Sequence, residues 1–119
     1  MTVPICDLIK DPIRYHGRLV EVHSRIAPAI IDTPDALVDL TCAASVPLYV
    51  DAPEAEKTVG AYREFRRYLS EWRTVEATVF GRFEMILVPS KKPILSFRLI
   101  RVTNVTPGPA YFPKRRKPT

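Results

Sequence analysis

The sequence predicts a mainly β domain that contains one amphipathic helix, and three observations support this fold class. Residues 18–26 and 74–87 alternate between apolar and polar side chains, which is typical of strands with one buried face. Between them, residues 55–69 repeat apolar side chains every three or four positions, which is typical of a helix. The length of 119 residues and the apolar share of 46% suit a single domain with its own core.

A short helix is expected at the start of the chain. Pro4 suits a first helical turn, because its missing N–H group has no partner to lose there. Ile5, Leu8 and Ile9 follow at the spacing that places side chains on one face of a helix. Pro12 is expected to end this turn, and a bend then leads into the first strand.

The first half of the chain then reads as strands. In the predicted strand over residues 18–26, Val20, Val22 and Ile26 share one side. A Thr-Pro-Asp turn at residues 33–35 interrupts the next part of the chain. Three shorter apolar runs are interpreted as strands or strand pieces, at residues 29–32, 36–41 and 46–50.

The helix between the two long alternating stretches has a recognisable beginning. Asp51 and Glu54 have the spacing of a capping box, in which each side chain satisfies a free backbone N–H of the first turn. The apolar stripe that follows consists of Ala55, Val59, Tyr62, Phe65 and Leu69. Gly60 costs about 1 kcal/mol relative to alanine in a helix, so it suggests close approach to a neighbouring strand.

Two long strands are expected after the helix. The inward series runs from Val75 through Val79 and continues past Gly81, so this strand must curve, and the glycine suits a bend or bulge. Residues 88–93 form a loop, and residues 94–105 form the last strand. Its alternation slips at Leu99 and Ile100, which predicts a bulge at that point.

This order of elements matches the OB-fold, a five-stranded, partly open Greek-key barrel. A single helix between the third and fourth strands is the feature that favours it, and an α+β sandwich is the competing architecture. The barrel domain is assigned to residues 1–106. Residues 107–119 hold four of the twelve prolines and have no periodicity, so they predict a disordered tail.

Three segments of the chain form motifs that occur together in a known family. The first consists of Cys6, Leu8, Pro12, Tyr15, Gly17, Val20 and Val22. The second spans residues 75–84, which end in Gly81-Arg82-Phe83-Glu84, and the third consists of Leu99, Ile100, Val102 and Val105. With these motifs residues 3–26 and 72–105, about half of the chain, resemble a family of small bacterial OB-fold-like proteins of unassigned function. The resemblance implies an OB-like fold and, because many members carry an export signal, an extracytoplasmic setting.

The charge of +5 is concentrated at the C-terminus. Lys114, Arg115, Arg116 and Lys117 lie between two prolines, and without them the chain keeps 14 of its 18 basic residues against 13 acidic ones. The tail could attract phosphate groups or bind an acidic partner, or it could be a solvated terminus without a partner.

The two cysteines leave two interpretations open. Cys6 and Cys42 could form one disulfide in an oxidising compartment, or they could be small buried side chains. Neither has the Cys-x-x-Cys or Cys/His spacing of a zinc site, so no metal ion and no cofactor is expected.

Catalysis is not indicated. The sequence has no nucleophile elbow, no His-Glu-x-x-His motif and no Walker loop. Its two imidazoles are His16, beside a bend, and His23, on the outer side of the first strand. Neither has a matched nucleophile, so both are interpreted as structural residues.

Basic residues point instead to anion binding. Lys91 and Lys92 fall in the loop between the last two strands, which borders the ligand face of OB-folds. Arg82 and Arg98 are secondary candidates on those strands, and Phe80 could stack on a base or pack under a loop.

The leading hypothesis is a non-enzymatic binding module for an anionic ligand, with single-stranded nucleic acid as the commonest case for this fold. The alternative is a structural or protein-interaction module, of which an exported envelope protein is one form. The sequence has no apolar run long enough for a membrane helix and no signal peptide, so a cytoplasmic location is expected. A periplasmic or exported location is expected if a signal peptide was removed.

Overall fold

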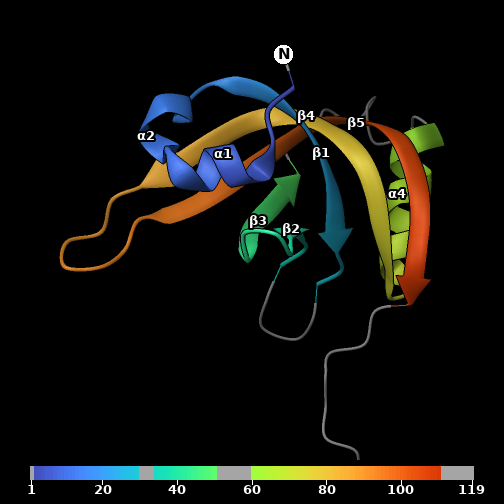
Figure 1. Ribbon diagram of the computed structural model, residues 1–119. Coiled ribbons are helices and arrows are strands. Elements are labelled where there is room, and N and C mark those ends of the chain that lie inside the picture. Colours follow the sequence, from blue (N-terminus) through green and yellow to red (C-terminus); the bar gives the residue numbers. More distant parts are fainter. Residues whose placement is uncertain (1, 30–33, 51–59, 111–119) are drawn as a thin grey trace, which may run out of the picture.

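The computed structural model describes residues 2–29, 34–50 and 60–110. Within these residues two short helices come first, followed by three strands, one longer helix and two further strands (Figure 1). They are α1 (Ile5–Lys10), α2 (Pro12–Tyr15), β1 (Leu19–Ala27), β2 (Ala36–Asp39), β3 (Ala44–Val50), α4 (Gly60–Ser70), β4 (Arg73–Ile86) and β5 (Ile94–Ala110). The predicted mainly β class, with one amphipathic helix between the third and fourth strands, is confirmed for this part of the chain.

The five strands form one sheet that closes in a ring, in the order β1-β2-β3-β5-β4. Neighbouring strands are antiparallel except for β3 and β5, which are parallel. Parallel pairing needs a crossover connection, and α4 lies within the segment that joins β3 to the β4–β5 pair. The helix packs against β4 and β5.

The interior of the ring is apolar and follows the alternation of the sequence. Val20, Val22 and Ile26 of β1 are buried, as are Phe65 and Leu69 of α4. Ser24 is the polar member of the inward series on β1, and its hydroxyl donates to the carbonyl oxygens of neighbouring backbone. The predicted capping box and the first part of the helix stripe lie outside the described residues.

Gly81 and the bulge in β5 lie side by side. The β4–β5 register shifts between Phe80 and Gly81, because Phe80 pairs with Arg101 while Gly81 pairs with Leu99. Ile100 is therefore the extra residue, and the predicted bulge is confirmed. A Cβ atom on Gly81 would overlap the carbonyl oxygen of Arg98, so only glycine allows β5 to approach this closely.

The end of β5 differs from the expectation. The strand continues to Ala110, so residues 107–110, which the sequence places in the tail, pair with the start of β4. Pro107 and Pro109 are tolerated because β3 pairs with β5 only at residues 97–99, which leaves this stretch as an edge. Arg73 and Thr74 of β4 donate to the carbonyl oxygens of Gly108 and Pro109.

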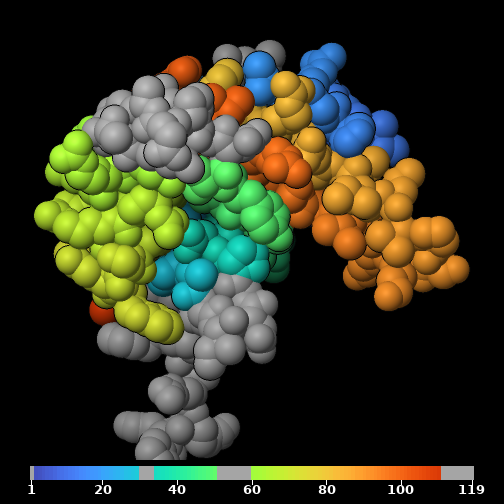
Figure 2. All heavy atoms as spheres, turned by 180° about the vertical axis from the view of Figure 1, so that it is seen from behind, coloured from blue at the N-terminus to red at the C-terminus, as the bar shows by residue number. Residues whose placement is uncertain are grey.

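The far end of the β4–β5 pair projects from the body as a hairpin arm, defined here as residues 84–96 (Figures 1 and 2). β1 pairs with β4 only as far as Arg82, and β3 reaches β5 only from Phe97 onward. His16 supports the base of the arm, because its Nδ1 accepts the backbone N–H of Met85 at 2.9 Å.

The beginning of the chain is tied to the ring by a disulfide. Cys6 of α1 is bonded to Cys42 in the turn between β2 and β3, with 5.9 Å between the Cα atoms. Pro12 does not simply end the first helix, because it is the first residue of α2. No helix in the described part of the chain is long and apolar enough to cross a membrane.

Candidate functional site

The two candidate arginines on the last strands occupy opposite positions. Arg82 of β4 and Arg98 of β5 are cross-strand partners, and both side chains are exposed on the outer surface of the sheet. Like charges in this position repel each other. Arg82 donates to the Gly17 carbonyl oxygen at 2.6 Å, and Arg98 donates to Glu84 at 2.8 Å.

Tyr49 extends this pair onto a third strand. In the parallel β3–β5 register Tyr49 is the partner of Arg98, and 48% of its surface is exposed. Tyr49, Arg98 and Arg82 thus form one row across β3, β5 and β4, which we call the arginine row. Tyr49 is not among the predicted site residues, although its place after the inward Leu48 is the period-two signal for an outward side chain.

Phe80 is not a bare stacking surface. Its ring is half-buried, and the guanidinium of Arg101 lies 4.7 Å from the ring centroid. The two residues are cross-strand partners, next to the bulge. A cation–π contact of this kind occupies one face of the ring.

Lys91 and Lys92 lie at the tip of the hairpin arm. Both are exposed, and the turn is held by a hydrogen bond from the Lys91 N–H to the Val88 carbonyl oxygen. Ile86, the last residue of β4, lies four positions beyond Arg82, which is about 13 Å along a strand. The structure therefore separates the lysines from the arginine row by the length of the arm.

The basic tail residues Lys114, Arg115, Arg116 and Lys117 lie outside the described residues.

A hollow of about 540 Å³ opens between β1, the start of β4 and the turn that follows β2. Its wall includes His23, Arg25, Glu76, Asp39 and Thr41. Glu76 is the common neighbour of two of these side chains: Arg25 lies 3.3 Å from its carboxylate, and the His23 Nε2 lies 4.0 Å from it. The His23 Nδ1 is 3.2 Å from the Thr78 hydroxyl, so both ring nitrogens have structural neighbours.

Asp39, in the same wall, accepts two hydrogen bonds from Thr41. The Thr41 hydroxyl and the Thr41 backbone N–H both donate to its Oδ1, at 2.6 and 2.8 Å. These hydrogen bonds, the hydroxyl first, lower the pKa of the Asp39 carboxyl below its usual value.

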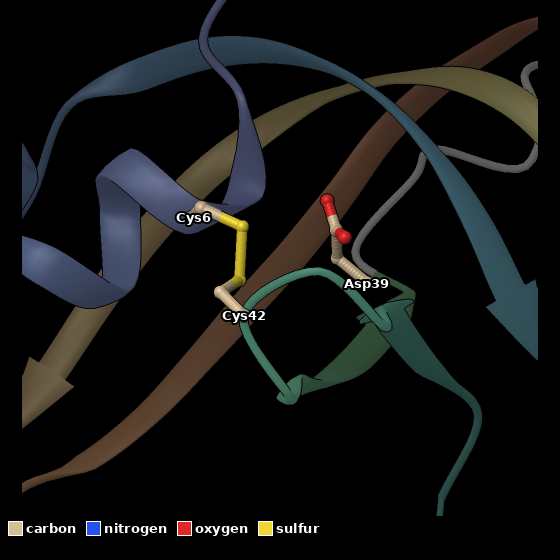
Figure 3. Close-up of side chains that lie close together, drawn as sticks. All are labelled: Cys6, Asp39 and Cys42. Carbon is tan, nitrogen blue, oxygen red and sulfur yellow. A yellow bond between two sulfur atoms is a disulfide. The ribbon is translucent and has the colours of Figure 1, made fainter.

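Asp39 also lies beside the disulfide (Figure 3). The two sulfur atoms and a carboxylate oxygen of Asp39 are all within 4.8 Å of one another. The sequence spacing of Cys6 and Cys42 did not indicate this cluster, because it forms only when α1 is placed against the turn between β2 and β3.

Comparison with known proteins found no matching family model, no matching curated protein and no matching solved structure.

Proposed function

We propose that this protein is an OB-fold binding module without catalytic activity, and that its arginine row binds an anionic polymer, foremost single-stranded nucleic acid. The strand order and the helix between β3 and β4 support the OB-fold, in which strands β1 to β5 form one small barrel. The observation that carries the functional proposal is the row itself, in which two opposed guanidinium groups adjoin an exposed tyrosine ring.

The charges of the row favour an anion. Arg82 and Arg98 are cross-strand partners, and Glu84 is an acidic partner of Arg98, while Arg82 donates to the neutral Gly17 carbonyl oxygen. A phosphate between the two guanidinium groups would relieve their repulsion and accept hydrogen bonds from both. The Tyr49 ring beside them offers a surface for one base, and stacking of this kind contributes about 1–3 kcal/mol per base.

The hairpin arm favours an elongated ligand over a small anion. Lys91 and Lys92 place two more cations at the tip of the arm, beyond the reach of a single phosphate in the arginine row. A single strand that runs along β4 and β5 would contact both groups. Loops between the fourth and fifth strands border the ligand face in OB-folds generally.

Fluorescence anisotropy with a labelled single-stranded oligonucleotide tests the proposal. We expect binding to the full chain that weakens as salt rises, and a double variant Arg82→Gln/Arg98→Gln that binds more weakly. For single strands the slope of log K against log salt scales at about 0.7 per phosphate contact. The two arginines share one phosphate in this proposal, so the variant should lose about 0.7 from that slope. Tyr49→Ala should weaken binding at every salt concentration, because stacking does not release counterions.

The matched control is Arg14→Gln/Arg67→Gln. It removes the same charge from two exposed arginines that stack on neighbouring tyrosines in α2 and α4. An equal loss of affinity in the two double variants would mean that binding follows net charge alone, and the arginine row would then be rejected as the site. No binding at low salt would reject nucleic acid as the ligand.

An exported protein-interaction module is the second candidate function, and two observations favour it. Ile86, Leu87 and Ile94 on the hairpin arm are each more than half exposed, which is typical of a surface that meets a partner. The disulfide is typical of an oxidising compartment. The lysines at the tip favour a partner strand that combines apolar and acidic residues. Binding of a synthetic Val-Glu repeat peptide, abolished by Ile94→Asp, would support this candidate, and failure of that peptide to bind would count against it.

A further inference from the structure

Three side chains of the metal-ligating kind meet where α1 contacts the turn between β2 and β3. Cys6 comes from α1, Asp39 is the last residue of β2, and Cys42 lies three positions further along the turn. Their two Sγ atoms and a carboxylate oxygen lie within 4.8 Å of one another. Figure 3 shows the Asp39 side chain beside the sulfur–sulfur bond. In this oxidised state the sulfurs bind each other and cannot ligate an ion.

Reduction would change what these three residues can do. Zn²⁺ takes thiolate ligands at about 2.3 Å and carboxylate ligands at about 2.0–2.2 Å in a tetrahedron, so neighbouring ligand atoms lie about 3.5–3.8 Å apart. The sulfurs would have to separate from bonding distance, and the carboxylate oxygen would approach them by at most about 1.3 Å. Both shifts are small, because the backbone already brings the three residues together.

Thr41 provides the support that metal ligands usually have. It binds Asp39 through Oδ1 alone, and within the described residues Oδ2 accepts no hydrogen bond, so that oxygen can face an ion. The Thr41 hydroxyl also lies 3.5 Å from the Cys6 Sγ. The single hydroxyl proton is donated to Asp39, so Thr41 orients the carboxylate, as outer-shell hydrogen-bonding groups do in metal sites, and only adjoins the Cys6 sulfur.

The hollow beside the cluster provides access. Asp39 and Thr41 both form part of its wall, so the carboxylate is reached from solvent. Three protein ligands leave one position of a zinc tetrahedron open for water, and the hollow is where that water would enter.

We propose that the reduced protein binds one Zn²⁺ ion through Cys6, Cys42 and Asp39, and that closure of the disulfide excludes the ion. A dithiol reductant supplies two electrons and two protons, which cleave the sulfur–sulfur bond to two thiols while the reductant becomes a disulfide. Zn²⁺ then replaces the two thiol protons, which are released to solvent. In the reverse direction the disulfide of the oxidised reductant takes up the two electrons and two protons from solvent, the bond between Cys6 and Cys42 forms again, and the ion is released.

Spectroscopic titration of the full chain tests this proposal. The protein is reduced with a phosphine, freed of the reductant without air and titrated with Co²⁺, which reports thiolate ligands by a charge-transfer band. We expect one Co²⁺ per chain, displacement by one Zn²⁺, and no band for the oxidised protein. Cys42→Ser should abolish the thiolate band of a two-sulfur site, and Asp39→Asn should weaken Zn²⁺ binding at least about tenfold.

Asp11→Asn is the matched control, because Asp11 is exposed and lies outside the cluster. If Asp39→Asn and Asp11→Asn bind Zn²⁺ equally well, or if the reduced wild type gives no thiolate band, the proposed site is wrong. The comparison stays informative if reduction loosens the fold, because two thiols in an unfolded chain would bind the ion without any dependence on Asp39. A zinc-dependent rise in the unfolding midpoint of the reduced protein, absent from the oxidised one, is expected as well.

Discussion

The close approach of β5 to β4 restricts position 81 to glycine. Gly81 lies on β4 beside the bulge in β5, and a side chain there would meet the backbone of Arg98 and the ring of Phe97. Gly60, by contrast, has nothing within 4 Å of the place where a Cβ would lie. The expectation that Gly60 permits a close strand contact is therefore wrong for the described residues, and the close contact belongs to Gly81.

Replacing Gly81 tests this difference. Gly81→Ala should lower the free energy of unfolding by about 1–3 kcal/mol, because the backbone of β5 must move to admit a methyl group. Gly60→Ala is the matched control and should leave stability unchanged or raise it by up to about 1 kcal/mol, since alanine is the better helix former. Urea unfolding monitored by circular dichroism measures both, and equal stability of the two variants would contradict the close packing at Gly81.

At the scale of elements, the disulfide joins α1 to a turn that belongs to the sheet. The bond encloses a sequence separation of 36 residues, which includes β1 and β2. A link across a loop of this length stabilises chiefly by restricting the unfolded chain. We therefore expect Cys6→Ser/Cys42→Ser to lose about 4 kcal/mol of unfolding free energy in urea titration. The reduced wild type should have the same free energy of unfolding as the double variant. If the oxidised wild type is no more stable than the double variant, the bond does not constrain the unfolded chain.

The last residues of β5 are expected to contribute to the stability of the domain. Residues 107–110 pair with the start of β4, and Arg73 holds the Gly108 carbonyl oxygen at 3.1 Å. A chain that ends at residue 110 should match the full chain in thermal stability. A chain that ends at residue 106 should lose about 1–3 kcal/mol, because it gives up these hydrogen bonds and leaves buried Thr74 without its acceptor. Equal melting of the two truncated chains would place the domain boundary at residue 106.

At the scale of the whole molecule, the charge divides between the described body and the C-terminal segment. Residues 111–119 hold four of the basic residues and no acid, so a chain that ends at residue 110 has a net charge of +1 instead of +5. Its affinity for a single-stranded oligonucleotide should fall, most clearly at low salt. The remaining binding should still depend on Arg82 and Arg98. Complete loss of binding on truncation would assign the interaction to the C-terminal segment and not to the arginine row.

Much of the fold follows from local patterns in the sequence. Alternation in residues 18–26 and 74–83 determines which side chains face the interior, because a strand has only two sides. The slip at Leu99 and Ile100 likewise determines the bulge, since an extra residue must break the alternation. The apolar stripe that ends at Leu69 determines the inner face of α4, because residues three or four positions apart lie on one side of a helix.

The candidate sites depend on contacts between segments that are distant in sequence. Tyr49 joins Arg98 and Arg82 only because β3 and β5 pair in parallel, a register that no local pattern specifies. The two cysteines and Asp39 meet only because α1 packs on the turn after β2. The sequence by itself determined the strands, the helix and their inward faces, since periodicity is a property of neighbouring residues. Only the tertiary structure decided the disulfide, the arginine row and the Cys6–Asp39–Cys42 cluster, because closure of the ring decides which outer side chains become neighbours.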